Sequence, residues 1–497
     1  MVEVLNTIKK QVDHVEVEAV NSKAQRDLFA KRKKIFPKRA SGTFRKFKWW
    51  VMFLTLWIYY LTPWIRWDRG EFAPNQAILV DIDHGRFYFF FITIWPQELY
   101  YIAGLLIMAG VGLFLVTSTV GRAWCGYTCP QTVWVDLFLV VERWIEGDRN
   151  ARMKLDKAAW SIAKTGKRVT KHVVWLFIAL VTGGAWVFYF ADAPTLLRNL
   201  LNGSASSIAY STIFVMTGLT YMFAGFLREQ VCTYMCPWPR IQGAMLDERS
   251  LVVTYNDWRG EPRSRHQKKS EVASQSGDCI DCNQCVVVCP MGIDIRDGQQ
   301  LECITCALCI DACNGVMDKI GKPRNLISYA TLNDYDANVA GKSTTTTWRS
   351  FIHARTIIYA GIMTIAALAL LYVLMSRSSV EVNILHNRNP IYILLSDGSI
   401  RNGFTVKVLN KKLEARKFII RTEGISGLAM QVAGADTGEQ KDVIVKVQAN
   451  GLESVRLFLR TTAESLKAEQ NTFQFVVTDV QSKEQITHDA TFYRPKK

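Results

Sequence analysis

All twelve cysteines of this 497-residue chain fall into short repeated motifs, and they are the residues best suited to chemistry. Eight of them form two runs with the spacing C-x2-C-x2-C-x3-C: Cys279, Cys282, Cys285 and Cys289, then Cys303, Cys306, Cys309 and Cys313. This spacing lets one tight loop bind three corners of an iron–sulfur cube, while a thiolate from elsewhere in the chain binds the fourth. Structural zinc also takes four thiolates, but it has no use for two interleaved sets of three plus one.

In paired runs of this kind, the fourth cysteine of each run ligates the other cluster. The spacing therefore predicts one [4Fe-4S] cluster on Cys279, Cys282, Cys285 and Cys313, and a second on Cys303, Cys306, Cys309 and Cys289. Pro290 follows the first run, whereas Asn314 stands where a proline usually follows the second. Proline is not a ligand, so this departure bears on the local backbone and on hydrogen bonding to sulfur, not on cluster binding itself.

The other four cysteines form a second repeat, C-x3-C-P. Cys125 and Cys129 lie in the first copy and Cys232 and Cys236 in the second, and an arginine, Arg122 or Arg228, precedes each copy. Both copies directly follow a long apolar segment. Two related halves that pack face to face would bring the four thiols to one site near a membrane surface.

Three kinds of chemistry compete for these four cysteines. Soft thiolates favour Cu(I), and a proline that begins a helix after Cys129 or Cys236 would place the sulfur at a helix N-terminus and lower its pKa. A thiol pair could instead cycle through a disulfide, although a reducing cytoplasm does not favour a static bond. The third alternative is that these small residues simply pack at a helix end.

Five apolar stretches free of charged residues are each about one bilayer core in length: 49–65, 99–121, 173–191, 208–227 and 356–376. They predict five transmembrane helices. Residues 1–48 hold 13 Lys and Arg against 5 acids, and 121–171 holds ten Lys and Arg, so both segments are expected in the cytoplasm. The long segment 228–355 then also lies in the cytoplasm, and the chain after about Ser376 lies on the far side.

The net charge of +16 is thereby largely located beside the membrane, and nucleic-acid binding loses its main support. After Ser376 the chain changes to short alternating runs, such as Phe404-Thr-Val-Lys-Val and Val443-Ile-Val-Lys-Val, separated by turn signals such as Asp397-Gly398. Period two without a helical run predicts an antiparallel β-sandwich, and the absence of cysteine from this part of the sequence means that no disulfide joins it.

The five spans, the segment from Gly121 to Gln131, the Cys232 copy, the double cluster motif and the β-sandwich together resemble the FixG/RdxA/CcoG family of bacterial cytochrome c oxidase accessory proteins. The resemblance extends along nearly the whole chain. It implies an inner-membrane oxidoreductase that assists assembly of cbb3-type oxidase and reduces Cu(II) to Cu(I) for its copper centre. Two [4Fe-4S] clusters would be the cofactors and copper the substrate or bound ion, with Cys125, Cys129, Cys232 and Cys236 as the site.

The expected fold is a multidomain membrane protein: an α-helical bundle of about five transmembrane helices, an inserted ferredoxin-like domain with two [4Fe-4S] clusters, and a C-terminal all-β immunoglobulin-like sandwich. The predicted parts are a basic cytoplasmic tail (1–48), a membrane domain of four helices with both C-x3-C-P repeats (49–258), a cytoplasmic ferredoxin-like domain (259–345), a fifth transmembrane helix (356–376) and a periplasmic sandwich (377–497).

The expected partners are the lipid bilayer, an electron donor, cbb3-type oxidase subunits and copper-handling assembly proteins; nucleic acid is not expected, and self-association is left open. No glycine-rich nucleotide fingerprint is present in the sequence, so the donor is expected to be a cytosolic protein or a quinol. Two other functions compete with copper reduction. One is a polyferredoxin-like electron-transfer subunit linked to quinol oxidation, and the other is an assembly scaffold whose clusters have no redox role.

Overall fold

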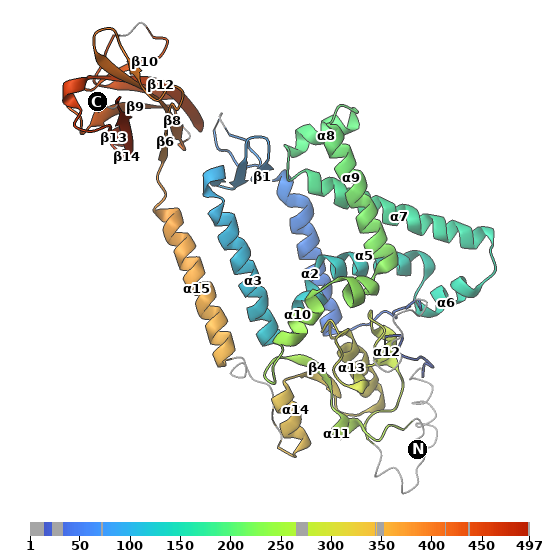
Figure 1. The fold of residues 1–497 in the computed structure, drawn as a ribbon. Helices are drawn as coiled ribbons and strands as arrows, with labels where there is room; N and C mark the ends of the chain where they lie inside the picture. The colour runs from blue at the N-terminus through green and yellow to red at the C-terminus, as the bar shows by residue number, and fades with distance from the viewer. Residues whose placement is uncertain are drawn as a thin grey trace. The chain divides into compact units, whose positions relative to one another are not determined.

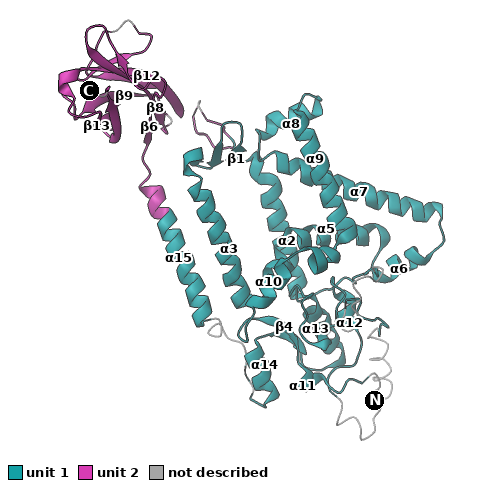
Figure 2. Ribbon diagram, viewed as in Figure 1, with its two compact units in different colours: residues 1–65, 76–370 teal, residues 66–75, 371–497 magenta. Residues whose placement is uncertain are grey.

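The computed structural model describes residues 14–21, 33–70, 73–264, 277–342, 344, 352–412, 414–435 and 438–495. Half of the predicted basic tail (1–48) and part of the predicted ferredoxin-like domain (259–345) lie outside these residues. The chain divides into two compact units (Figure 2). The first comprises 1–65 and 76–370, and the second comprises 66–75 and 371–497.

Four helices among the described residues are long and apolar enough to cross a membrane, at Pro96–Val120, Ile162–Val187, Ser207–Leu227 and Ala354–Met375. Their cores are α3 (Tyr100–Val120), α7 (Ile162–Val187), α9 (Ser207–Thr220) and α15 (Ala354–Met375), and α9 continues into the π-helical segment η4 (Tyr221–Leu227). They match four of the five predicted spans.

Helix α7 differs from the third predicted span, 173–191, because it begins at Ile162 and not near 173. Its first turns are cationic, so hydropathy alone misses them. The Ser161 side chain caps the helix by accepting a hydrogen bond from the backbone N–H of Lys164 at 3.2 Å, which fixes the earlier start.

The first predicted span, 49–65, lies in α2 (Thr43–Leu61), which runs into the short turn η2 (Thr62–Trp64). The first turns of α2 carry Arg45, Lys46 and Lys48, so the uncharged part of this helix begins only at Trp49. For this reason α2 falls short of the length and composition of the other four, and a fifth transmembrane helix stays a prediction.

Close helix packing in the first unit depends on small residues. A Cβ atom on Gly183 of α7 would lie 2.9 Å from the carbonyl oxygen of Ile213 in α9, so glycine lets the two backbones approach. At the start of α3 lies a three-stranded antiparallel sheet of β1 (Ile78–Asp81), β2 (Arg86–Phe89) and β3 (Ile92–Ile94), with the short turn η3 (Pro96–Glu98) after it.

At the other end of the bundle, short helices contain or follow each C-x3-C-P repeat (Figure 1). They are α4 (Ala123–Tyr127), α5 (Pro130–Glu146) and α6 (Arg149–Lys157) after α3, and the π-helical η5 (Val231–Met235) and α10 (Trp238–Met245) after η4. Helix α8 (Ala193–Leu201) instead joins α7 to α9.

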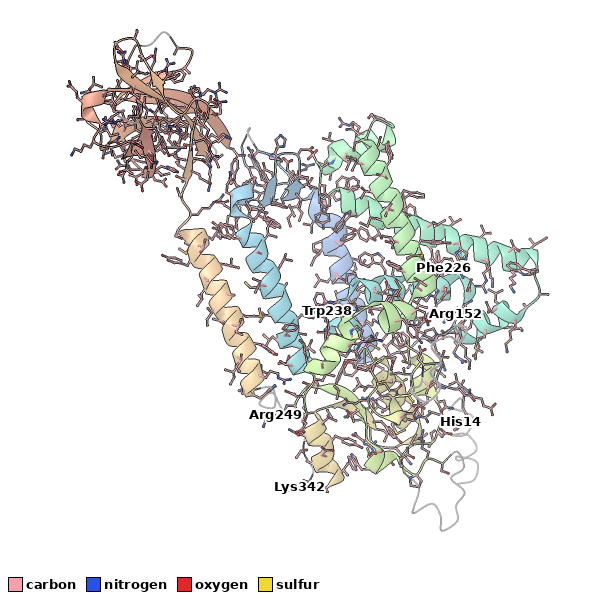
Figure 3. The ribbon with its side chains drawn as sticks, viewed as in Figure 1. His14, Arg152, Phe226, Trp238, Arg249 and Lys342 are labelled. Carbon is pink, nitrogen blue, oxygen red and sulfur yellow. The ribbon has the colours of Figure 1, made fainter. Side chains whose placement is uncertain are left out.

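A buried ionic network joins these short helices. Glu142 of α5 accepts from Arg152 of α6 at 2.8 Å and from Arg228 at 2.9 Å, and Lys171 of α7 lies 3.7 Å away (Arg152 is labelled in Figure 3). All four side chains are at least nine-tenths buried. The network fixes the segment that leads into Cys232 to the rest of the bundle.

The cysteine-rich segment lies where α2 begins and α3 ends (Figure 1). Strands β4 (Val252–Tyr255) and β5 (Ile327–Ala330) pair antiparallel, and between them in the chain come α11 (Asp257–Gly260), α12 (Gln284–Val288), η7 (Ile295–Asp297) and α13 (Leu308–Ile320). Helix α14 (Leu332–Val339) follows β5. Strand β4 lies before the predicted domain boundary at 259, yet its partner β5 lies well after it.

Asp311 of α13 attaches this segment to the first helix of the bundle. Its carboxylate accepts hydrogen bonds from the backbone N–H groups of Phe44 at 3.2 Å and of Arg45 at 2.7 Å, at the N-terminus of α2. A carboxylate is favourable there, because it satisfies two otherwise unpaired N–H groups and meets the positive end of the helix dipole.

The second unit contains the predicted β-sandwich. One antiparallel sheet has the order β10-β12-β8-β6 with β7 at the edge of β8, and the other has the order β11-β9-β13-β14. Alternate residues of both sheets, among them Phe404, Phe418, Phe475 and Phe492, form one core without cysteine. The strands are β6 (Val380–His386), β7 (Ile393–Leu394), β8 (Ser399–Asn410), β9 (Arg416–Glu423), β10 (Ala429–Val432), β11 (Val443–Val447), β12 (Gly451–Thr462), β13 (Gln470–Asp479) and β14 (Gln485–Tyr493).

Candidate iron–sulfur and thiol site

The two C-x2-C-x2-C loops have the same backbone conformation. The middle cysteine of each lies between two residues of positive φ, Asp281 (49°) and Asn283 (58°) in the first loop, Thr305 (56°) and Ala307 (58°) in the second. Such alternation turns successive N–H groups to one side of the loop, where they can meet negative charge such as that of a thiolate-bound cluster. Helices α12 and α13 begin directly after these left-handed residues.

The cysteines of the first predicted group lie together. Cys279, Cys285 and Cys313 are buried in one hydrophobic cluster, and Cys282 packs at its edge. Burial, and then the neighbouring thiols of Cys282 and Cys279, raise the pKa of Cys313 to about 12. The last cysteine of the second run therefore lies with the first three of the first run.

The cysteines of the second predicted group, Cys303, Cys306, Cys309 and Cys289, line a single pocket. Its remaining wall is mainly apolar and includes Ile293, Ile304 and Leu308, with Cys285 of the other group at one side. Burial, followed by the thiols of Cys306 and Cys303, raises the pKa of Cys289 to about 12. Asn314 uses its side chain to accept a hydrogen bond from the backbone N–H of Asn325 at 2.8 Å.

These residues fit two iron–sulfur clusters. All twelve cysteines are free of disulfides, and the eight discussed here are half-buried or buried within an apolar shell. Among the described residues, no three His, Cys, Asp or Glu side chains surround a point where a single ion would sit. In a [4Fe-4S] cluster each of the four thiolates binds a different iron, whereas in a zinc site all four bind one ion. Four thiols that do not converge on a single point therefore suit a cluster better than zinc.

The N-terminal segment 14–21 covers the first loop, a contact that the predicted basic tail does not lead one to expect. The backbone N–H of Val15 donates to the carbonyl of Cys282 at 3.3 Å, and Asn283 Nδ2 donates to the carbonyl of Val15 at 2.9 Å. Val17 and Ala19 pack against the hydrophobic cluster of the first cysteine group. Their alternation with glutamates is the one sequence signal that could have revealed an ordered, half-buried segment here.

The C-x3-C-P cysteines lie in the short elements after α3 and η4. Cys125 is in α4, and Cys129 caps α5, which begins at Pro130 as expected. Cys232 is in η5, whereas Cys236 stands one residue before Pro237, which itself caps α10. Cys236 is therefore further from its helix N-terminus than the sequence predicts.

The four C-x3-C-P thiols influence one another. Burial raises the pKa of Cys125 to about 11, with the thiols of Cys129 and Cys236 adding to it against the opposing charge of Arg122. Burial raises the pKa of Cys232 to about 12, and the thiols of Cys129 and Cys125 add to it. The two repeats thus converge on one place, although they form no ready-made site for a single ion.

This place adjoins the second cysteine group. Cys125 and Cys232 pack against the same hydrophobic cluster as Cys289, Cys303 and Cys306. A Cβ atom on Gly126 of α4 would lie 2.6 Å from the carbonyl oxygen of Ile304 and 3.1 Å from the backbone of Cys306, so only glycine permits the contact.

Hydrogen bonds hold this junction on both sides. The Tyr127 hydroxyl donates to the carbonyl of Cys306 at 3.2 Å, and the Tyr329 hydroxyl donates to the carbonyl of Thr305 at 2.6 Å. Cys125 Sγ donates to Gln242 Oε1 at 3.0 Å, and the buried Gln242 in turn donates to Thr117 Oγ1 at 3.2 Å. Both cysteine sets are thus fixed relative to each other.

A Gly126→Val variant tests the junction. We expect it to push α4 away from the loop at Cys306, because its Cβ atom meets backbone that cannot rotate aside. Electron exchange between the clusters and an acceptor at the C-x3-C-P thiols should slow at least tenfold, while iron content stays normal. Stopped-flow absorbance of the reduced protein would measure this rate, and Gly315→Val, at a glycine whose Cβ atom would meet nothing within 4 Å, is the matched control.

Three family models match the chain: a 4Fe-4S dicluster domain at residues 227–332, a 4Fe-4S binding domain at 102–147, and the IG-like fold at the C-terminal end of FixG at 370–495. The nitrogen fixation protein FixG of Rhizobium meliloti (strain 1021) is 55% identical over 512 residues, which cover 98% of each chain. Protein RdxB of Cereibacter sphaeroides is 52% identical, covering 94% of this chain and 97% of its own. Protein RdxA of the same organism is 53% identical, covering 87% and 90%.

The fold, the cysteine groups and these matches define a membrane iron–sulfur protein of electron transfer with a C-terminal immunoglobulin-like domain. Within that class, the chain belongs to the FixG/RdxA family, with near full-length relatives at more than half identity. The expected family and the expected kind of cofactor are confirmed.

Proposed function

We propose that this protein reduces Cu(II) to Cu(I), and that Cys125, Cys129, Cys232 and Cys236 are the site of reduction. The observation that carries the proposal is the contact of Gly126 with the loop at Ile304 and Cys306, which sets the C-x3-C-P thiols beside the second cysteine group. Electron transfer weakens steeply with distance, so a contact of this kind favours transfer between the two sites.

The ligands follow from the chemistry of the thiols. We assign one [4Fe-4S] cluster to Cys279, Cys282, Cys285 and Cys313, and the second to Cys303, Cys306, Cys309 and Cys289. When bound, these clusters supply single electrons, and Cu(II) needs one to become Cu(I).

The chain's own part is to position the thiols and to favour the product. Two hydrogen bonds hold Cys125 in place. Gln242 Oε1 accepts one from Cys125 Sγ at 3.0 Å, and the Thr132 hydroxyl donates the other to the Cys125 carbonyl at 2.6 Å. Soft sulfur favours Cu(I) over Cu(II), and a pair of thiolates is enough to bind it, so reduction does not require three ligands around one ion. Since burial keeps Cys125 and Cys232 protonated, binding of copper would release their protons.

The proposed setting is the inner membrane of a bacterium, with the N-terminal tail and the clusters in the cytoplasm and the β-sandwich in the periplasm. The basic segments 1–48 and 121–171 support this orientation. In that setting, the protein would supply Cu(I) during assembly of a cbb3-type oxidase, and the sandwich would contact oxidase subunits or copper-handling assembly proteins.

The decisive experiment adds Cu(II) to the anaerobic, chemically reduced protein in detergent, with cluster absorbance and a Cu(I) chelator followed together. We expect cluster oxidation and Cu(I) formation to proceed in step, and both to fail in a variant with serine at Cys125, Cys129, Cys232 and Cys236 that retains its clusters. Equal rates in the variant would overturn the site. No copper reduction by either protein would favour a polyferredoxin-like relay or a scaffold.

A further inference from the structure

A pocket of about 400 Å³ lies beside the second cysteine group, and the proposed function does not use it. Cys303 forms part of its wall, and much of the remaining wall is apolar, with Leu246, Val252, Leu301 and Leu332. Its volume falls within the range of small-molecule sites, which are commonly apolar with a few polar groups that orient the ligand. A molecule bound there would lie against a predicted cluster ligand.

Two polar groups of the pocket wall have atoms without a hydrogen-bond partner. Arg122 is 3% exposed and uses Nη1 to donate to the carbonyl of Leu301, but its Nε and Nη2 have no partner among the described residues. Gln300 donates through Nε2 to the carbonyl of Asp294, while its Oε1 has none. Unsatisfied buried groups are costly, so a donor and an acceptor left in one wall point to a ligand.

The charges of the wall exclude a nucleotide. The residues that line the pocket include the carboxylates of Asp247 and Glu248 and one cation, Arg122, so phosphates would meet more negative than positive charge. The sequence also lacks the glycine-rich loop that usually binds phosphates. A neutral, mainly apolar molecule that both accepts and donates a hydrogen bond fits this wall better.

The position of the pocket in the fold further limits which class of ligand fits it. Arg122 follows the last turn of α3, and α3 is one of the four helices apolar enough to span a membrane. The pocket therefore opens at the end of a transmembrane helix, within reach of a lipid-soluble molecule. A quinol has the apolar ring, the two polar ends and the membrane solubility that these observations require.

We propose that this pocket binds a quinol, which is the electron donor of the reaction proposed above, and the inference rests on that function. Oxidation of one quinol to the quinone breaks two O–H bonds and releases two electrons and two protons. The two clusters that the eight cysteines would hold would take one electron each, and the two protons would leave to water past Glu248, which is exposed at the rim of the pocket. Arg122 donates to the quinone oxygen and Gln300 Oε1 accepts from the hydroxyl.

The test uses the purified full chain and decylubiquinol as the probe, with two readouts. Anaerobic decylubiquinol should bleach the oxidised clusters of the wild type. A photoreactive azidoquinone should label the segments around Leu246 and Leu301, as mapped by mass spectrometry, whether or not the clusters are reduced.

Two variants should separate the pocket from the clusters. Leu332→Trp fills the pocket and should slow bleaching and labelling at least tenfold, and Gln300→Leu should weaken labelling about tenfold. Val339→Trp, which adds the same ring on the exposed end of α14, should match the wild type. All three should be reduced by dithionite as the wild type is and should then reduce Cu(II), which keeps this result independent of the proposed function.

Failure of decylubiquinol to bleach or label the wild type would overturn the inference, and so would equal bleaching in Leu332→Trp. Reduction of the wild type by a protein donor alone would have the same meaning. If dithionite-reduced protein still reduces Cu(II) in that case, the proposed function stands and only the donor is wrong.

Discussion

Cys289 belongs to the first cysteine run, yet a Cys289→Ser variant should lose the second cluster, predicted on Cys303, Cys306 and Cys309. It should keep the first cluster. Cys289 lines the pocket of Cys303, Cys306 and Cys309, and burial with the thiols of Cys306 and Cys303 raises its pKa. Serine offers a harder oxygen ligand in an apolar shell, so the second cluster should be lost. Iron should fall from about eight to about four per chain.

The reciprocal variant makes the result specific. Cys313→Ser should empty the first site, because Cys313 lies with Cys279, Cys282 and Cys285 although it belongs to the second run. The electron paramagnetic resonance spectra of the two dithionite-reduced variants should then each show one uncoupled cluster. Those spectra, together with iron and sulfide analysis, would check the prediction.

Cys236→Ser is the matched control, since it makes the same chemical change outside both groups and should leave about eight irons. The interleaved assignment would be contradicted if Cys289→Ser lost the cluster of its own run, predicted on Cys279, Cys282 and Cys285, and kept the cluster of the second run. Zinc in place of iron in the wild type would contradict the clusters altogether.

The placing of the cysteines in two groups could be predicted from the sequence because their spacing is a property of the covalent chain, and their assignment as cluster ligands stays a prediction. Three cysteines within seven residues can only form one loop, and the left-handed residues Asn283 and Ala307 then follow from how tightly that loop must turn. The interleaving also follows, since Cys289 and Cys313 are separated from their loops by one helical turn each.

What the sequence could not give is which distant surfaces meet. Asp311 caps α2 from a position 266 residues away in the chain, and Val15 reaches the loop of Cys282 across a similar separation. Gly126 is one glycine among 31 until Ile304 is seen against it. The start of α7 and the sheet of β1 to β3 are hard to find for a different reason, because a helix cap and strands of three or four residues leave little trace in a hydropathy profile.

Replacement of Glu142 by alanine should unfold the membrane part of the protein more readily than any comparable surface change. The carboxylate is 2% exposed and accepts from Arg152 and Arg228. Without it, two guanidinium groups stay buried with no carboxylate to balance them, and breaking a buried pair in this way costs about 3–5 kcal/mol. That is a large share of the total stability of an ordinary domain.

The loss should reach the thiol site, because Arg228 lies four residues before Cys232, the first cysteine of the second C-x3-C-P repeat. Arg228 has a left-handed backbone, with φ of 43°, which a non-glycine residue adopts only when its surroundings hold it there. Its side chain is held by Glu142, so release of the guanidinium should let this turn relax and move Cys232. We expect the Glu142→Ala protein that still folds to reduce Cu(II) more slowly than the wild type.

The pH dependence gives an independent check on the same carboxylate. Burial alone would raise the pKa of Glu142, but Arg228, Arg152 and Lys171 outweigh it and lower the pKa from 4.5 to about 2. A lowered pKa in the folded state means that this carboxylate stabilises the fold above about pH 4.5, and that its contribution is lost as the pH falls towards 2.

Glu142→Gln, which cannot ionise, should therefore be less stable than the wild type chiefly at neutral pH and differ least from it in acid. The midpoint of thermal unfolding in detergent at several pH values would measure this difference in stability. Asp318→Ala is the control, because it removes only the exposed ion pair with Arg324 and its midpoint should equal that of the wild type. A Glu142→Ala midpoint equal to that of the control would mean that the guanidinium groups find water or other partners, and that the network does not hold the turn at Arg228.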